Sequence, residues 1–217
     1  METLLGIAGK GFVVLAADAQ VGRSILVYKD NIDRIASLTK DKLLATGGPQ
    51  SDCVNFSEYI AKNIALYELN NDVKLSTKAT ATFVRGELAK AIRRGPIMSN
   101  ILLGGVDKGT DGKCEASLYW MDYLGTQQKV SFGAHGYGAA FTLSIMDREH
   151  FEGITKDEAV AIIDKCINEI QTRFLVAQKN FVVKVITADG IKVIRAPKHD
   201  AGEAEASAET PAVPVQG

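Results

Sequence analysis

The stretch that decides the fold is Leu-Leu-Gly-Ile-Ala-Gly-Lys-Gly-Phe-Val-Val-Leu-Ala-Ala-Asp, residues 4–18. Two apolar runs, residues 4–8 and 12–17, flank a turn with the sequence Gly-Lys-Gly. A glycine-containing turn between two β-prone runs is typical of a β-hairpin. The second run has no polar alternation, so we predict a strand that is buried on both faces.

A carboxylate, Asp18, follows the second run directly. At the mouth of a buried strand it could be a catalytic or orienting group, because burial and neighbouring charges tune the pKa of a carboxyl. It could equally cap a turn by accepting hydrogen bonds from nearby backbone N–H groups. The pattern alone favours the cap.

Composition describes an ordinary globular chain. Its 217 residues are 46% hydrophobic and 24% charged, with a formal net charge of -1. This length allows one large domain or two small ones. The charge gives no reason to expect nucleic acid or an anionic membrane as a partner. We found no charged-then-apolar leader and no long apolar run, so neither secretion nor a membrane span is expected.

No metal or cofactor site is predicted. The cysteines Cys53, Cys114 and Cys166 are far apart and form no Cys-x-x-Cys pair, which favours reduced thiols in an intracellular protein. His135 has no second metal ligand nearby in the sequence, so we interpret it as a hydrogen-bonded packing histidine. The run 133–138 also lacks the glycine spacing of a dinucleotide loop.

Strand and helix patterns alternate in blocks along the rest of the chain. The β-type runs are 24–28, 32–38, 42–46, 100–106, 115–122, 127–132, 181–187 and 191–194, and the helical runs are 51–69, 76–94, 139–147 and 155–174. In the first helix the predicted buried stripe is Cys53, Phe56, Ile60, Ile64 and Tyr67. Such blocks predict an α+β domain built in layers.

Turn and cap signals separate these blocks. Ser76 can cap the second helix, and the run Thr155-Lys-Asp-Glu158 is a capping box for the fourth. Residues 188–190, Ala-Asp-Gly, predict a closing β-hairpin. The sequence Gly47-Gly48-Pro49 predicts a tight turn from strand to helix, with Pro49 in the first helical turn.

Five runs of this sequence together resemble the proteasome β-subunit family. They are residues 4–7, 56–60, 83–93, 122–126 and 133–137. Within the family they are most similar to the non-catalytic subfamily that the mammalian naming calls beta type-2. The resemblance implies a four-layer αββα sandwich of the N-terminal-nucleophile hydrolase type, spanning residues 1–196. The remainder, 197–217, is rich in Ala, Glu, Pro and Gly, and we expect a disordered tail.

The resemblance also places the parts of an active site on this chain. Active members use a free N-terminal threonine as both nucleophile and, through its amine, base, with an aspartate and a lysine beside it. Those three positions fall on Glu2, Asp18 and Arg34. A carboxylate is a weak nucleophile toward an amide, and an arginine stays protonated and cannot relay protons as a tuned lysine can. We therefore assign no catalytic residue.

Two further supporting parts are missing by the same comparison. The serine that supports the nucleophile falls on Ala134 or His135, and the Asp-x-x-Ser-Gly run falls on 174–180, which has no aspartate, serine or glycine. Gly47 and Gly48 match the glycine pair of the oxyanion hole. That match says little about activity, because the fold needs this turn whether or not catalysis survives.

Two other functions stay open at this point. If residues 1 and 2 were trimmed, Thr3 could act as an N-terminal nucleophile, making the chain an active threonine-type peptidase. Thr3 is one residue out of register with Asp18 and Arg34, and a one-residue slip turns a strand side chain to the opposite face. The second alternative is a stand-alone homo-oligomeric hydrolase of the bacterial type.

The favoured function follows from the resemblance. It implies a non-catalytic structural β subunit of the 20S proteasome core, which takes part in ATP- and ubiquitin-dependent protein degradation. The implied partners are other β subunits in the same and the facing β ring, and subunits of the α rings. The implied location is the cytoplasm and the nucleus.

Overall fold

The computed structural model describes residues 2–23, 26–109, 112–176 and 178–197. The tail predicted for 197–217 therefore lies, from residue 198 on, outside the described residues. Of the run predicted at 24–28, the structure describes residues 26–28, which belong to a strand.

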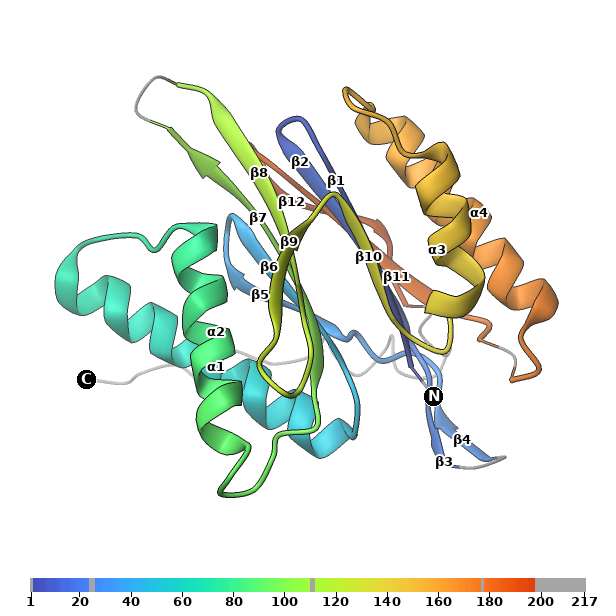
Figure 1. Cartoon of the computed structure of the whole chain (residues 1–217), viewed down its shortest axis with the longest axis horizontal. Helices are drawn as coiled ribbons and strands as arrows, with labels where there is room; N and C mark the ends of the chain where they lie inside the picture. Colours follow the sequence, from blue (N-terminus) through green and yellow to red (C-terminus); the bar gives the residue numbers. More distant parts are fainter. Residues whose placement is uncertain (1, 24–25, 110–111, 177, 198–217) are drawn as a thin grey trace, which may run out of the picture.

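Two five-stranded antiparallel sheets face each other (Figure 1). The first has the order β10 (Phe132–Gly136), β1 (Thr3–Gly9), β2 (Phe12–Asp18), β11 (Phe181–Thr187) and β12 (Gly190–Arg195). The second has the order β5 (Ile35–Thr39), β6 (Lys42–Gly47), β7 (Asn100–Lys108), β8 (Cys114–Met121) and β9 (Gln127–Val130). A separate two-stranded ribbon consists of β3 (Val21–Arg23) and β4 (Leu26–Lys29).

A pair of helices covers the outer face of each sheet. The helices α1 (Gln50–Asn71) and α2 (Thr77–Ala91) pack on the second sheet, and α3 (Ala139–Glu149) and α4 (Lys156–Arg173) pack on the first. The predicted αββα sandwich is confirmed. Of the described helices, none combines the length and the apolar character needed to cross a lipid bilayer.

The predicted N-terminal hairpin is formed by β1 and β2. Gly9 pairs with Phe12, and the intervening Gly11 has a φ of 80°, a backbone conformation that glycine adopts without strain. All seven residues of β2 are buried, as the absence of polar alternation predicted. β2 lies between β1 and β11 in its sheet.

The apolar residues of this hairpin divide between two cores. Leu5 and Val14 face the helices α3 and α4, whereas Leu4 and Leu15 face the opposite sheet. The sheets approach closely because glycine stands at their contact. A Cβ atom on Gly104 would lie 2.7 Å from a methyl carbon of Val13. A third core lies between the second sheet and its own helices.

The helix caps follow the sequence signals. The Ala79 N–H donates to Ser76 Oγ at 3.1 Å, and Thr155 and Glu158 make both hydrogen bonds of a capping box. One prediction for α1 was wrong: Tyr67 is 46% exposed although the other four residues of its stripe are buried. Leu66 and Leu69 are exposed as well, so the C-terminal turns of α1 extend beyond the part of the sheet that the helix covers.

The contact between the sheets should dominate the stability of the domain. Leu15→Ala should lower the free energy of unfolding by about 2–5 kcal/mol, because it leaves a cavity between two sheets that cannot both collapse into it. The measurement is urea unfolding of the purified chain. Leu69→Ala, at an 81% exposed position, is the control and should change the value by less than about 0.5 kcal/mol. Equal losses in the two variants would contradict this assignment of the core.

Candidate functional site

The strand ends bring together two of the residues that the resemblance places in a site. Asp18 is the last residue of β2 and Arg34 directly precedes β5, and both side chains are buried. Arg34 Nε lies 3.8 Å from Asp18 Oδ1. This is the distance of an ion pair without a hydrogen bond, so each charge stabilises the other within the protein interior.

Asp18 also holds the start of β1. Its Oδ1 accepts a hydrogen bond of 2.8 Å from the Thr3 N–H, and its Oδ2 accepts one of 3.4 Å from the Gln20 N–H. The turn-capping role that the sequence pattern favoured is confirmed. Burial raises the pKa of Asp18 to about 6, although the charge of Arg34 and the Thr3 N–H offset part of the effect.

Arg34 connects three segments of the chain. Its Nη1 donates to Gln50 Oε1 at 3.1 Å, and its Nη2 donates to the Gln20 carbonyl oxygen. Gln50 is the first residue of α1, so the guanidinium joins the end of β2 to the beginning of that helix. A planar group that is always protonated suits this fixed role and cannot exchange protons with a nucleophile.

Thr3 points away from the place where a nucleophile would stand. Its side chain is fully buried, and a Cβ atom on Gly138 would lie 2.5 Å from Thr3 Oγ1. Gly138 is the N-cap of α3, so the hydroxyl lies under the helix layer. Glu2 is on the other side of the strand, where a Cβ atom on Gly47 would lie 3.7 Å from Glu2 Cβ.

The second glycine of the pair, Gly48, directly follows β6 and has a structural explanation. Gly48 has a φ of 147°, and a Cβ atom there would lie only 2.0 Å from the Met98 carbonyl oxygen. A side chain is therefore excluded by the backbone of another segment. Pro49 is the N-cap of α1 and stands just before the helix, not inside its first turn.

His135 occupies one of the two positions where active relatives would have a supporting serine, and it has a packing role. Its Nε2 hydrogen bonds to the Ile101 carbonyl at 3.1 Å, and its ring stacks on Trp120 with centroids 4.5 Å apart. In return Trp120 Nε1 donates to the Ala134 carbonyl at 3.1 Å. These contacts join β10 of one sheet to β7 and β8 of the other. Burial lowers the pKa of His135 to about 4.

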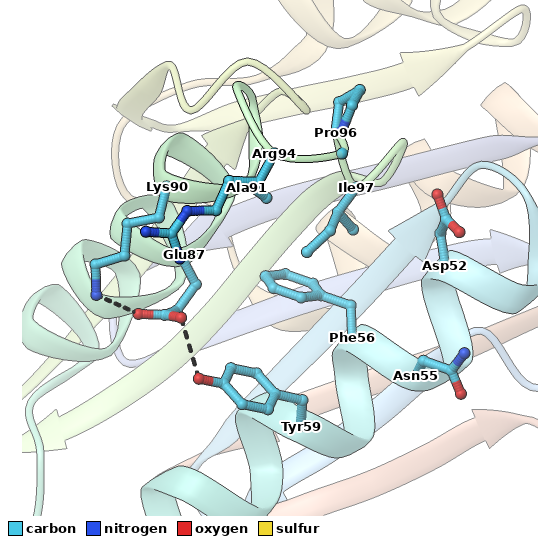
Figure 2. Close-up of a pocket in the computed structure, with 11 residues that line it drawn as sticks. Asp52, Asn55, Phe56, Tyr59, Glu87, Lys90, Ala91, Arg94, Pro96 and Ile97 are labelled. Atoms are coloured by element: carbon cyan, nitrogen blue, oxygen red, sulfur yellow. Dashed lines mark hydrogen bonds and ion pairs between the residues drawn. The ribbon is translucent and has the colours of Figure 1, made fainter.

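A surface groove away from these strand ends is bordered by polar side chains that are hydrogen bonded to one another. It has a volume of about 570 Å³ and lies between α1 and the end of α2, where Phe56 and Ile97 line it (Figure 2). On its rim Glu87 accepts hydrogen bonds from Tyr59 Oη at 3.1 Å and Lys90 Nζ at 2.7 Å. Within the described ranges no three His, Cys, Asp or Glu side chains cluster in a way that could hold a metal ion.

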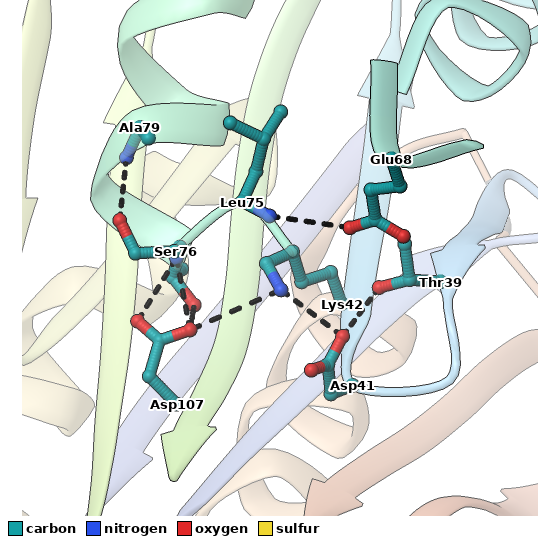
Figure 3. Close-up of polar contacts among 9 residues, drawn as sticks. Thr39, Asp41, Lys42, Glu68, Leu75, Ser76, Ala79 and Asp107 are labelled. Atoms are coloured by element: carbon teal, nitrogen blue, oxygen red, sulfur yellow. Dashed lines mark hydrogen bonds and ion pairs between the residues drawn. The ribbon is translucent and has the colours of Figure 1, made fainter. Parts of the chain in front are cut away.

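Sequence reasoning missed a buried lysine at the opposite end of the second sheet (Figure 3). The side chain of Lys42 is 1% exposed, with Nζ 3.0 Å from Asp41 and 3.9 Å from Asp107. Asp107 also accepts hydrogen bonds of 2.9 Å from the Thr77 N–H and hydroxyl. The sequence does not indicate that a lysine at the first position of a strand is buried. Its second partner, Asp107, comes from a strand 65 residues later (107 − 42).

Comparison with known proteins identifies the family of the chain. Residues 1–186 match the model of the proteasome subunit family. The chain is 45% identical over 192 residues to proteasome subunit beta type-2-B of Arabidopsis thaliana, which covers 88% of this chain and 94% of that protein. It is 44% identical over 195 residues to proteasome subunit beta type-2 of Dictyostelium discoideum, covering 89% and 97%.

A fungal relative carries a different subunit number. Proteasome subunit beta type-4 of Saccharomyces cerevisiae is 38% identical over 195 residues, which is 89% of this chain and 97% of that protein. Relatives named beta type-2 and beta type-4 both match over most of their own length. The similarity found in five short runs of sequence therefore extends through the domain.

The buried carboxyl of Asp18 should make stability depend on pH. Because its pKa rises from 3.8 to about 6 on folding, the folded chain binds this proton more tightly than the unfolded chain. Its contribution to the free energy of unfolding is therefore present below pH 3.8 and is lost as the pH rises through about 6. The loss should amount to about 3 kcal/mol.

Asp18→Asn removes the titration and should remove this term. The measurement is the difference in unfolding free energy between the wild type and Asp18→Asn from pH 3.5 to pH 7. Asp157→Asn, at a side chain that is 92% exposed, corrects for the loss of one charge. A difference that stays constant across this range would contradict the prediction.

Proposed function

We propose that this chain, which belongs to the proteasome subunit family, is a non-catalytic structural β subunit of the 20S core. The observation that carries the proposal is the set of groups at the strand ends. By the family resemblance Glu2 falls at the nucleophile position and Arg34 at the lysine position, while the hydroxyl of Thr3 is buried on the other face of β1. The strand ends have the framework of such a site but lack its reacting groups.

The chemistry of the family requires more than an aspartate. An N-terminal nucleophile needs a hydroxyl and a free amine on the same residue, with a neighbour that can exchange protons. Asp18 is present, but its carboxylate is engaged by the Thr3 N–H and by the charge of Arg34. Asp18, which would orient the nucleophile in an active subunit, therefore holds the first residue of β1 by a hydrogen bond.

The relatives support a place in a hetero-oligomeric ring. Those compared above are named proteasome subunits beta type-2 or type-4. The proposed partners are unlike β subunits on both sides, β subunits of the facing ring and subunits of the α ring. A stable position of this kind needs interfaces of well over ~1,000 Å² in total. The outer helix layers, with exposed apolar side chains such as Leu66 and Leu69, are suited to such contacts.

The proposed role is geometric. The chain would help to form the wall of the proteolytic chamber and would position catalytically active neighbours, with beta type-5 as the foremost candidate. The process served would be ATP- and ubiquitin-dependent protein degradation, in the cytoplasm and the nucleus. Immunolocalisation of a tagged chain together with an α-ring subunit tests the location.

The alternatives remain distinguishable by direct measurement. A peptidase working through Thr3 requires removal of residues 1 and 2, which N-terminal sequencing of the assembled protein detects. Its hydroxyl would also have to leave the buried position under Gly138. A homo-oligomeric hydrolase would show a single subunit type when the purified particle is analysed by mass.

Removal of the Thr3 hydroxyl should leave proteolysis intact. In particles that carry Thr3→Ala, all peptide-hydrolysing activities should equal those of the wild type, and a peptide-like electrophile should modify sister chains but not this one. Peptide hydrolysis assays and intact-mass analysis measure the two effects. Particles in which an active sister chain has lost its N-terminal threonine are the control. Loss of one activity class with normal assembly, or a covalent adduct on this chain, would overturn the proposal.

Deletion of residues 197–217 should leave assembly unchanged. Every described strand and helix ends at or before Arg195, and the family match ends at residue 186. Native gel electrophoresis of particles containing the truncated chain should show the wild-type mobility and yield. A truncation ending at residue 189, which removes β12, should reduce the yield and serves as the contrast. Failure of the 197–217 deletion to assemble would show that the tail binds a neighbour.

A further inference from the structure

The ribbon of β3 and β4 leaves apolar side chains uncovered. In β4, Leu26 is 60% exposed, Val27 55% and Tyr28 67%. The ribbon projects away from both five-stranded sheets, near the N-terminal end of the chain (Figure 1). Three consecutive exposed apolar residues in one strand are unusual, because a strand normally buries at least one of its faces.

Alternation along β4 makes this strand apolar on both faces. Leu26 and Tyr28 point to one side and Val27 to the other, since successive strand residues alternate. A flat partner surface could cover only one of these sides. A partner that covers both must enclose the strand, so the shape that fits is a cleft and not a plane.

The base of the ribbon is fixed to the domain at the candidate site. The Ile32 N–H donates to the Ala19 carbonyl at 2.9 Å, and Asn180 Nδ2 donates to both the carbonyl and the side chain of Asp30 at 3.1 Å. Arg34 holds the Gln20 carbonyl just before β3. A segment anchored at both ends of its base keeps its direction, so little ordering is needed there when a partner binds.

The charge on the ribbon indicates the chemistry of the partner. Lys29 is exposed and takes part in no ion pair with any residue that the structure describes. The carboxylate of Asp30, next in the chain, is already engaged by Asn180. A complementary surface therefore combines an apolar interior with an acidic rim. A second copy of the same ribbon would offer Lys29 only another cation beside apolar side chains.

We propose that residues 26–29 insert into an apolar, acid-rimmed cleft on a different β subunit next to this chain in the ring. This inference rests on the proposed function and gives it a specific contact. The ribbon begins three residues after Asp18, so the segment that follows the Asp18–Arg34 ion pair also carries the contact with the neighbour. The partner is recognised by its cleft and its carboxylates, and not by pairing of identical strands.

Substitution on the ribbon tests the insertion. The double variant L26S/Y28S, tagged and expressed beside the wild-type chain, should enter assembled particles on the order of tenfold less well, because two partly exposed apolar side chains lose their burial in the cleft. Leu175→Ser, at a position 97% exposed outside the helix layers, is the matched control and should enter as the wild type does. The thermal midpoint of the full chain should shift by less than about 2 °C in the double variant.

The outcomes separate the two proposals. Normal entry of the double variant while the wild-type chain assembles would overturn the insertion and leave the structural role intact. Absence of the wild-type chain itself from particles would overturn the proposed function.

A photo-crosslinking phenylalanine analogue at position 28 identifies the partner. The expected product joins this chain to one other β chain, at a peptide containing Asp or Glu beside apolar residues. A product with a second copy of this chain, with an α-ring subunit, or no product in assembled particles would overturn the inference.

Discussion

The structure depends on one strand that is buried on both faces. β2 contributes side chains to two cores at once, one toward the helices α3 and α4 and one toward the opposite sheet. Such a strand can exist only if both neighbouring layers close over it, and the approach of the sheets in turn requires glycine at positions such as 104. The four layers are therefore mutually dependent, because removing any one of them would expose apolar side chains of β1, β2 or β7 that are now buried.

The end of that strand is a junction of buried charged and polar groups. Asp18 accepts the Thr3 N–H and lies beside the Arg34 guanidinium, which also holds the beginning of α1. The Asp18 carboxylate thus lies at the junction of β1, β2 and α1, where it has a structural role. An arginine suits the position beside it, since a permanently charged and planar group can make several fixed hydrogen bonds.

Polar groups in this chain mostly serve to join layers. His135 and Trp120 exchange hydrogen bonds with backbone carbonyls across the two sheets, and Lys42 joins the sheet to the start of α2 through Asp107. In the described residues, the ribbon of β3 and β4 differs from these, because its apolar side chains face outward and contribute to no core of the domain. A chain that assembles with other subunits can carry such a segment, since its stability in isolation is not the only constraint on its surface.

The sequence by itself determined the α+β layers, the first hairpin and the caps at Ser76 and Thr155, because local periodicity and residue chemistry decide those features. It also placed His135 as a packing group, although its partners Trp120 and Ile101 could not be read from the pattern. Only the tertiary structure decided that Asp18 and Arg34 form an ion pair, that Lys42 is buried, that Tyr67 is exposed and that Thr3 lies under Gly138. The physical reason is the same in each case: these properties depend on which distant segment covers a side chain, and a sequence pattern records the period of an element but not its neighbours.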